Sequence, residues 1–133
     1  MPVKDLRQSV TFKAPPKAVY EALFDPKLHA KFTGRPAKIE PRQGGEFTFW
    51  GGLLTGHVMQ FVPSQRIVLA WRHTGWPKGL YSIVWIELEK VRGGTRLTLE
   101  QYGIPSFDFS HISDGWKEFY WSPLRSFLAA PSK

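Results

Sequence analysis

Short turn signals divide the middle of the chain into apolar segments, and this spacing limits the fold more than any other feature. The signals lie at residues 43–45, 50–52, 63–64 and 92–94, and all but the third contain paired glycines. Paired glycines are typical of hairpin turns because glycine tolerates the positive φ that such turns require. Parallel strands need crossover connections of about a dozen residues or more, so connections this short predict an antiparallel sheet.

About seven strands are predicted. Side chains from Leu6 to Ala14 alternate between a mainly apolar and a polar set, which is the pattern of a strand with one buried face. The other predicted strands are Ala37–Glu40, Glu46–Trp50, Leu54–Val62, Arg66–Arg72, Leu80–Lys90 and Thr95–Tyr102.

Two short helices are predicted after the first strand. The pair Pro15-Pro16 ends that strand, and the apolar residues that follow recur at helical spacing. Asp25 before Pro26 has the order of an N-cap and a first helical residue, so a second short helix is expected through about residue 32.

The last part of the sequence predicts a long amphipathic helix. Pro123 lies inside it and removes a backbone donor, so we expect a bend there. Such a helix must cover the concave face of the curved sheet, and the predicted fold class is therefore α+β. The apolar residues that define the helix recur at steps of one, three and four: Ile112, Trp116, Phe119, Tyr120, Pro123, Leu124, Phe127 and Leu128.

Composition excludes several classes of function. The chain has 133 residues, and one domain is predicted over residues 1–133. The absence of cysteine excludes disulfides, thiolate metal sites and cysteine nucleophiles. No G-x-S-x-G, phosphate-loop or G-x-G-x-x-G motif occurs, and no cofactor is expected. No apolar run is long enough for a signal peptide or a membrane span, so we expect a cytoplasmic location and no membrane contact.

The four histidines do not form a metal-ligand pattern, because none pairs with another at a spacing of four residues. We interpret His29, in a basic short helix, and His73, beside a turn, as surface residues. For His57 we expect a structural or surface position, with a pocket acid or base as the alternative.

The net charge of +7 is concentrated near the start of the chain, where nine basic and four acidic residues lie between Lys4 and Arg42. Single-strand nucleic-acid binders interleave aromatic rings with such charge. Among Phe, Trp and Tyr, residues 26–42 contain only Phe32, so no nucleic-acid partner is expected. A solvated basic face or a protein contact is the remaining interpretation, with these candidates: Lys27, Lys31, Arg35, Lys38 and Arg42.

Several short motifs follow one another along almost the whole chain. They are Gly44-Gly45-Glu46-Phe47, Leu53-Leu54-Thr55-Gly56, Val62-Pro63, Arg66-Ile67-Val68, Trp71-Arg72, Trp76-Pro77-Lys78-Gly79, Tyr81-Ser82, Gly94-Thr95-Arg96-Leu97-Thr98-Leu99, Gly103-Ile104-Pro105, Gly115-Trp116, Phe119-Tyr120 and Pro123-Leu124. In this order, from about residue 10 to 128, they resemble the domain of the Hsp90 ATPase activator homologues, a family of the START-like, Bet v 1-like SRPBCC superfamily.

The resemblance implies a helix-grip fold, in which an antiparallel sheet wraps around a long C-terminal helix. It also implies an Hsp90-type chaperone as a partner. The eukaryotic co-chaperones of the family carry a separate N-terminal domain, which these 133 residues are not expected to hold.

In START-like folds the space between sheet and helix is often a hydrophobic cavity, so binding of an apolar small molecule without catalysis is the first predicted function. A core closed by its own rings and a small cavity are equally compatible with the sequence. The candidate cavity residues are Phe47, Phe49, Leu69, Trp71, Ile86, Leu97, Leu99, Gln101, Trp116, Phe119, Tyr120 and Leu124.

A protein-interaction module is the alternative function. Tyr81, Ile83 and Trp85 lie on the strand face opposite the core, where a one-sided antiparallel sheet is normally polar. An exposed apolar strip of this kind favours a chaperone contact or self-association, so the chain is expected to be a monomer or a weak homodimer. A cyclase-like or hydrolase-like enzyme is a weaker third hypothesis, with these candidate residues: Gln101, Tyr120 and His57.

Overall fold

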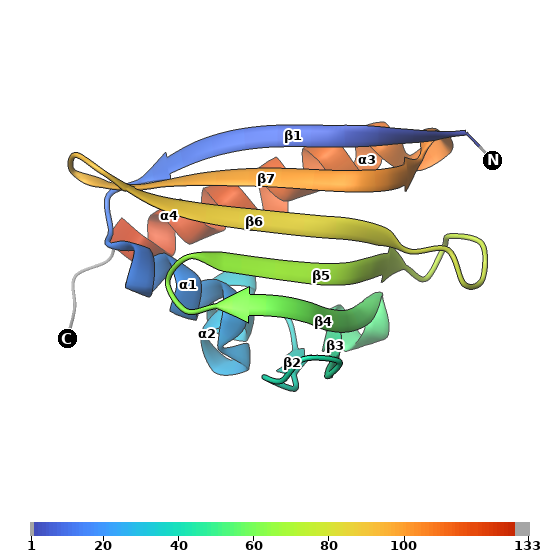
Figure 1. The fold of residues 1–133 in the computed structure, drawn as a ribbon, viewed down its shortest axis with the longest axis horizontal. Coiled ribbons are helices and arrows are strands. Elements are labelled where there is room, and N and C mark those ends of the chain that lie inside the picture. Colours follow the sequence, from blue (N-terminus) through green and yellow to red (C-terminus); the bar gives the residue numbers. More distant parts are fainter. Residues whose placement is uncertain (1, 130–133) are drawn as a thin grey trace.

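The computed structural model describes residues 2–129, so residue 1 and residues 130–133 of the predicted domain lie outside the described part. Seven strands form one antiparallel sheet in the order β1-β7-β6-β5-β4-β3-β2. The helices lie on one side of this sheet (Figure 1). The strands are β1 (Val3–Phe12), β2 (Ala37–Ile39), β3 (Glu46–Phe49), β4 (Leu54–Val62), β5 (Arg66–His73), β6 (Ser82–Val91) and β7 (Gly94–Pro105).

The predicted antiparallel sheet and its number of strands are confirmed. Each strand from β2 to β6 pairs with the next one along the chain, and β1 pairs with β7, so β1 and β2 are the two edge strands. Most strand ends differ from the predicted bounds by one to three residues, and at one of them the chain takes a different structure. Trp50 does not end β3 but begins the 3-10 turn η1 (Trp50–Gly52), because the chain reverses there with Trp50 at φ 59° and two glycines at positive φ.

The two predicted short helices are α1 (Pro16–Phe24) and α2 (Pro26–Thr33). Asp25 separates them as expected. Its carboxylate accepts hydrogen bonds from the backbone N–H groups of Lys27, at 2.8 Å, and Leu28, at 3.4 Å. The side chain therefore satisfies donors that the start of α2 would otherwise leave unpaired.

The C-terminal helix is continuous but not uniformly α-helical. After the 3-10 turn η2 (Ser106–Asp108), it runs through α3 (Phe109–Gly115), the π-helical segment η3 (Trp116–Trp121) and α4 (Ser122–Ala129). Pro123 has no N–H to donate to the carbonyl of Phe119, and the N–H of Ser122 donates to the carbonyl of Lys117, five residues back. The helix thus accommodates Pro123 with a widened turn.

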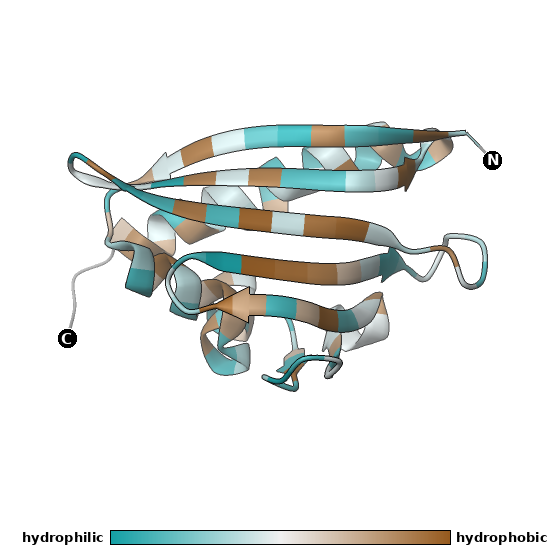
Figure 2. Ribbon diagram, in the orientation of Figure 1, coloured by the Kyte–Doolittle hydropathy of each residue, from teal (hydrophilic) through white to brown (hydrophobic). Residues whose placement is uncertain are grey.

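The core lies between the concave face of the sheet and the helices. Inward side chains of β3 to β7 meet Trp116, Tyr120, Trp121 and Leu124 of the C-terminal helix, and α1 and α2 close one end. Figure 2 shows that the middle of β5 is apolar along consecutive residues, so this strand is hydrophobic on both faces. In residues 2–129 no helix is both long and apolar enough to cross a membrane.

Candidate functional site

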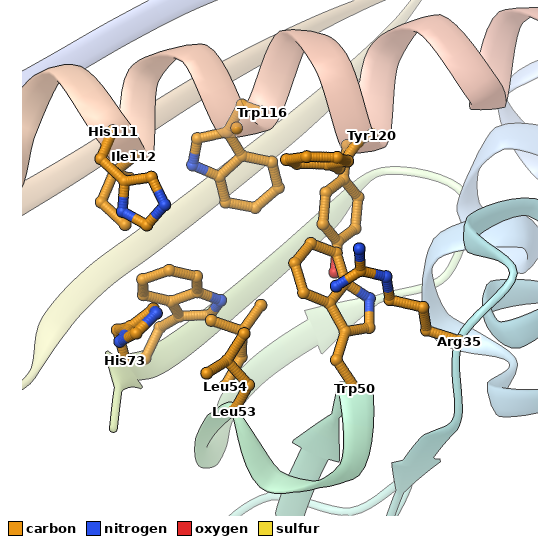
Figure 3. Close-up of a pocket in the computed structure, with 12 residues that line it drawn as sticks. Arg35, Trp50, Leu53, Leu54, His73, His111, Ile112, Trp116 and Tyr120 are labelled. Atoms are coloured by element: carbon orange, nitrogen blue, oxygen red, sulfur yellow. The ribbon is translucent and has the colours of Figure 1, made fainter. Parts of the chain in front are cut away.

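A pocket of about 260 Å³ opens between the C-terminal helix and the edge of the sheet near η1 (Figure 3). Its walls come from the segment after α2, from η1, from the adjoining ends of β4 and β5, and from α3 and η3. The lining residues are Arg35, Trp50, Leu53, Leu54, Trp71, His73, His111, Ile112, Gly115, Trp116, Phe119 and Tyr120.

Trp50 forms one wall and holds an unfavourable backbone conformation to do so. Its φ of 59° lies in the left-handed region, which is uncommon for a bulky residue and costs about 1–2 kcal/mol. The conformation brings the indole against Tyr120, with ring centroids 5.6 Å apart, and against Phe119, at 5.8 Å. Backbone strain of this kind is common at functional sites, so the conformation of Trp50 favours a functional role for the pocket.

Trp71 and Trp116 form the inner wall. Their ring centroids are 6.1 Å apart in a stacked arrangement, and Trp71 also contacts Trp76 edge-on at 5.5 Å. The π-helical turn contributes here, because its extra residue per turn lets Trp116, Tyr120 and Trp121 all be buried against the sheet. The inner surface of the pocket is consequently built from aromatic rings.

Charged and titratable groups are found at the mouth. The guanidinium of Arg35 lies over the ring of Trp50, 4.7 Å from its centroid, and 5.4 Å from that of Phe119. His73 and His111 lie at the other side, with ring centroids 5.8 Å apart (Figure 3). His73 Nδ1 accepts from the N–H of Gly75 at 2.8 Å, and burial lowers the pKa of His73. His111 Nδ1 lies 2.9 Å from a carboxylate oxygen of Asp108.

A second, much smaller cavity of about 20 Å³ lies deeper between sheet and helix. It shares Trp71, Trp116 and Tyr120 with the outer pocket, and its remaining lining is apolar except for His29. A space of this size holds about one water molecule. The deep interior is therefore filled by side chains, and the room for a ligand lies in the outer pocket.

The interpretation of His29 as a surface residue is wrong. Its side chain is 2% exposed, and its ring nitrogens lie 2.9 Å from the carbonyl oxygen of Leu23 and 2.9 Å from the hydroxyl of Tyr120. Burial lowers the pKa of His29 to about 4 and raises that of Tyr120. The sequence held a signal for this position, since His29 and Phe32 are three residues apart on one face of α2.

The twelve candidate cavity residues fall into three groups. Trp71, Trp116, Phe119 and Tyr120 line the outer pocket, where Phe119 remains 37% exposed at the mouth. A second group lines the small inner cavity. A third group is fully buried and lines neither space. The second group is Phe47, Phe49, Leu69 and Ile86, and the third is Leu97, Leu99, Gln101 and Leu124.

The structure does not bring together the three candidate catalytic residues. Gln101 is buried, its amide donates to the Ser82 hydroxyl at 2.9 Å, and its carbonyl oxygen accepts from the Trp116 N–H at 2.8 Å. Tyr120 is paired with His29, whereas His57 is exposed on the outer face of the sheet. Within residues 2–129 no cluster of three or more His, Cys, Asp or Glu side chains is suited to hold a metal ion.

The outer strip of Tyr81, Ile83 and Trp85 lies on the face of the sheet opposite the helices. Tyr81 is 42% exposed, and Ile83 and Trp85 are half-buried. The Trp85 N–H donates to a carboxylate oxygen of Glu87 at 2.8 Å, and the guanidinium of Arg66 lies 5.2 Å from the Trp85 ring centroid. Polar partners thus cover part of this ring.

The five basic candidates do not form one group. Lys27, Lys31 and Lys38 are exposed, and exposed Arg42 lies 3.5 Å from Glu40. Arg35 differs from them because its guanidinium belongs to the pocket mouth.

Sequence reasoning missed Trp50 and the pair His73 and His111 as pocket residues. Alternation along β3 placed Trp50 in a strand, although the two glycines after it signalled a chain reversal. The histidines are 38 positions apart, so only the docking of α3 against the end of β5 brings them together.

Comparison with known proteins places this geometry in context. The family described as "Activator of Hsp90 ATPase homolog 1-like protein" matches residues 13–129. The human protein named "Activator of 90 kDa heat shock protein ATPase homolog 1" is 30% identical over 115 residues, which are 86% of this chain and 34% of that protein. This chain thus spans about a third of the length of the curated relatives it matches.

Solved structures that share the fold include the following two. An Hsp90 activator from Plasmodium falciparum has a TM-score of 0.89 at 22% identity and covers 97% of this chain and 99% of its own. The structure of the Aha1 dimer from Colwellia psychrerythraea has a TM-score of 0.75 at 22% identity, with coverage of 94% and 96%.

Proposed function

This chain belongs to the family of Activator of Hsp90 ATPase homolog 1-like proteins, and from that premise we propose that it binds an apolar small molecule, without catalysis, in the pocket between sheet and helix. The observation that carries the proposal is the aromatic pocket of about 260 Å³. Ligand sites are typically concave and mostly apolar, with a few polar groups at defined places. An engineered apolar cavity of about 150 Å³ already binds benzene.

The internal pairing of polar groups supports binding rather than catalysis. The hydroxyl of Tyr120 and the amide of Gln101 are both engaged by core partners, so neither is available to a substrate. A catalytic acid or base must be within hydrogen-bond reach of the reacting group. The pocket walls instead supply ring surfaces, from Trp50, Trp71 and Trp116.

The proposal is tested with N-phenyl-1-naphthylamine, an uncharged probe whose fluorescence rises in an apolar site. Gly115 lines the pocket in helical geometry, and a Cβ placed on it meets only Phe119, at an ordinary 3.9 Å. Gly115→Leu therefore fills the pocket without straining the backbone, and Gly115→Ala is the matched control. We expect saturable enhancement with the unchanged protein and with Gly115→Ala, and its loss with Gly115→Leu. No enhancement, or equal enhancement in all three proteins, overturns the proposal.

A second candidate function is contact with an Hsp90-type chaperone. The names of the human and Plasmodium falciparum relatives favour it, since both are described as activators of that chaperone. The exposed basic residues Lys27, Lys31 and Lys38 give this chain a surface that suits an acidic partner.

The test adds this chain to full-length Hsp90 from the same organism and measures the rate of ATP hydrolysis together with binding. Stimulation that is weakened by the double change Lys31→Glu and Lys38→Glu supports this function. No binding at high micromolar concentration contradicts it and leaves small-molecule binding as the function.

A further inference from the structure

The polar groups of the pocket are almost all donors or cations. Its lining, drawn from residues 2–129, contains no Asp, Glu, Asn, Gln, Ser or Thr. Two of its polar groups are already engaged, because the Tyr120 hydroxyl pairs with His29 and the Trp116 N–H donates to Gln101. The groups that remain call for a ligand that supplies hydrogen-bond acceptors.

Arg35 is the cation that such a ligand meets first. The ion pairs among the described residues all involve other groups, and no described carboxylate lies within reach of the Arg35 guanidinium. Cation–π contacts with the rings of Trp50, at 4.7 Å, and Phe119, at 5.4 Å, hold the guanidinium at the pocket mouth. Figure 3 shows it beside the Trp50 indole, on the side away from His73 and His111. A cation–π contact uses no hydrogen-bond acceptor, and no described carboxylate pairs with the guanidinium, so its N–H donors are free for an anion.

Two buried indole donors lie behind the pocket wall. The indole nitrogens of Trp50 and Trp71 are buried beneath the surface of the pocket wall and have no acceptor within the described part of the chain. Trp71 is only 4% exposed. Buried donors without a partner are rare in proteins and destabilising. Because these nitrogens are closed to solvent, they do not face the open pocket, and the free donors that a ligand meets are those of Arg35.

Asp108, the carboxylate near the histidines, does not oppose an anion in the pocket. Its two oxygens are engaged by the Trp76 N–H, at 2.7 Å, and by His111, at 2.9 Å. Asp108 is also not part of the lining. The carboxylate of Asp108 is thus hydrogen-bonded to His111 and Trp76, and Arg35 lies on the opposite side of the pocket mouth.

We propose that the pocket selects small apolar molecules of one to three aromatic rings that carry an acidic group, a carboxylate or its equivalent, and that Arg35 binds this group while the tryptophan walls hold the rings. The inference rests on the proposed small-molecule function and names its ligand class. Arginine suits the role because its planar fork matches the geometry of an oxyanion.

The test uses two probes with the same ring system. 1-Anilinonaphthalene-8-sulfonate is N-phenyl-1-naphthylamine with an added sulfonate. The ratio of the two affinities therefore measures the contribution of the anionic group to binding. We expect the unchanged protein to bind the sulfonate probe more tightly than the neutral one. Arg35→Gln is expected to lower the affinity for the sulfonate probe about five- to tenfold and the affinity for the neutral probe by less than about twofold. Arg35→Lys is expected to restore part of the difference.

Two controls separate this inference from a general attraction to a protein of net charge +7. Lys38→Gln removes a nearby exposed cation that does not line the pocket, and it is expected to leave both affinities unchanged. Gly115→Leu is expected to abolish binding of both probes. If Arg35→Gln lowers the affinity for both probes equally, or for neither, the proposed preference for an anion is wrong, whereas binding of apolar molecules in the pocket is not contradicted. If the neutral probe does not bind at all, the proposed function itself fails.

Discussion

The imidazole Nε2 of His29 lies 2.9 Å from the phenolic oxygen of Tyr120 and joins α2 to η3 across 91 positions of sequence. The other ring nitrogen lies 2.9 Å from the carbonyl oxygen of Leu23, which can only accept. Burial lowers the pKa of His29 to about 4, so at pH 7 the ring is neutral, with its proton on Nδ1, and its Nε2 accepts from the Tyr120 hydroxyl. This bond fixes the ring of Tyr120, one wall of the pocket.

Acidification is expected to destabilise the protein through His29. Its pKa is about 4 in the folded state and about 6.5 when unfolded, because burial disfavours the charged ring. The stabilisation is fully present above pH 6.5 and is lost as the pH falls toward 4, by about 3 kcal/mol in total. Urea unfolding at pH 7 and pH 5 measures the loss. His29→Gln should show a smaller loss between these values; an equal loss in both proteins contradicts the assignment.

Tyr120→Phe is expected to lower the free energy of unfolding by about 1–3 kcal/mol, because it leaves the Nε2 of His29 buried without a donor. Tyr20→Phe is the matched control. The pKa of Tyr20 is raised by burial alone, and removal of its hydroxyl should change stability by less than about 0.5 kcal/mol. Urea unfolding at pH 7 compares the variants, and similar losses in both would exclude a special role for the His29 bond.

Gly56→Ala is expected to destabilise the sheet strongly. Gly56 pairs with Phe47 on one side and Trp71 on the other, and a Cβ there would overlap the carbonyl oxygen of Ala70. We expect a loss of about 3 kcal/mol or more by urea unfolding. Gly34→Ala, at φ +75° with open space around it, should cost only about 1 kcal/mol of backbone strain. Equal costs at the two glycines would contradict the steric argument.

Trp85→Lys tests whether the outer strip mediates self-association. Lysine at this outer, half-buried position can pair with Glu87, so the far-ultraviolet circular dichroism should not change. If the strip is an interface, light scattering after size-exclusion chromatography should give a smaller mass at high concentration than for the unchanged protein. Phe107→Lys, at a 68% exposed ring in η2, should have no effect on mass. An unchanged monomer before and after Trp85→Lys would exclude the interface.

Local patterns anticipated most of the fold because the signals were strong and short-range. Alternation gave the inward faces of the strands, and Asp25 before Pro26 marked the start of α2. The candidate site was anticipated less completely. Trp71, Trp116 and Tyr120 followed from periodicity, but the outer wall at Trp50 depended on a backbone conformation that alternation does not encode.

The burial of His29 likewise could not be predicted from the charge of its neighbours in the sequence. Its neighbours Lys27 and Lys31 suggested a solvated helix, whereas the packing of α2 against η3 decided that one face of this basic helix is buried.

The sequence by itself determined an antiparallel sheet covered by one long helix, because short turns permit no other pairing and the helix had one apolar face to bury. It did not determine whether the rings between them would close or leave room. That was decided by tertiary packing: the π-helical turn before Pro123 and the reversed chain at Trp50 orient large rings from distant segments. The space left between such rings depends on their three-dimensional fit, which no local pattern specifies.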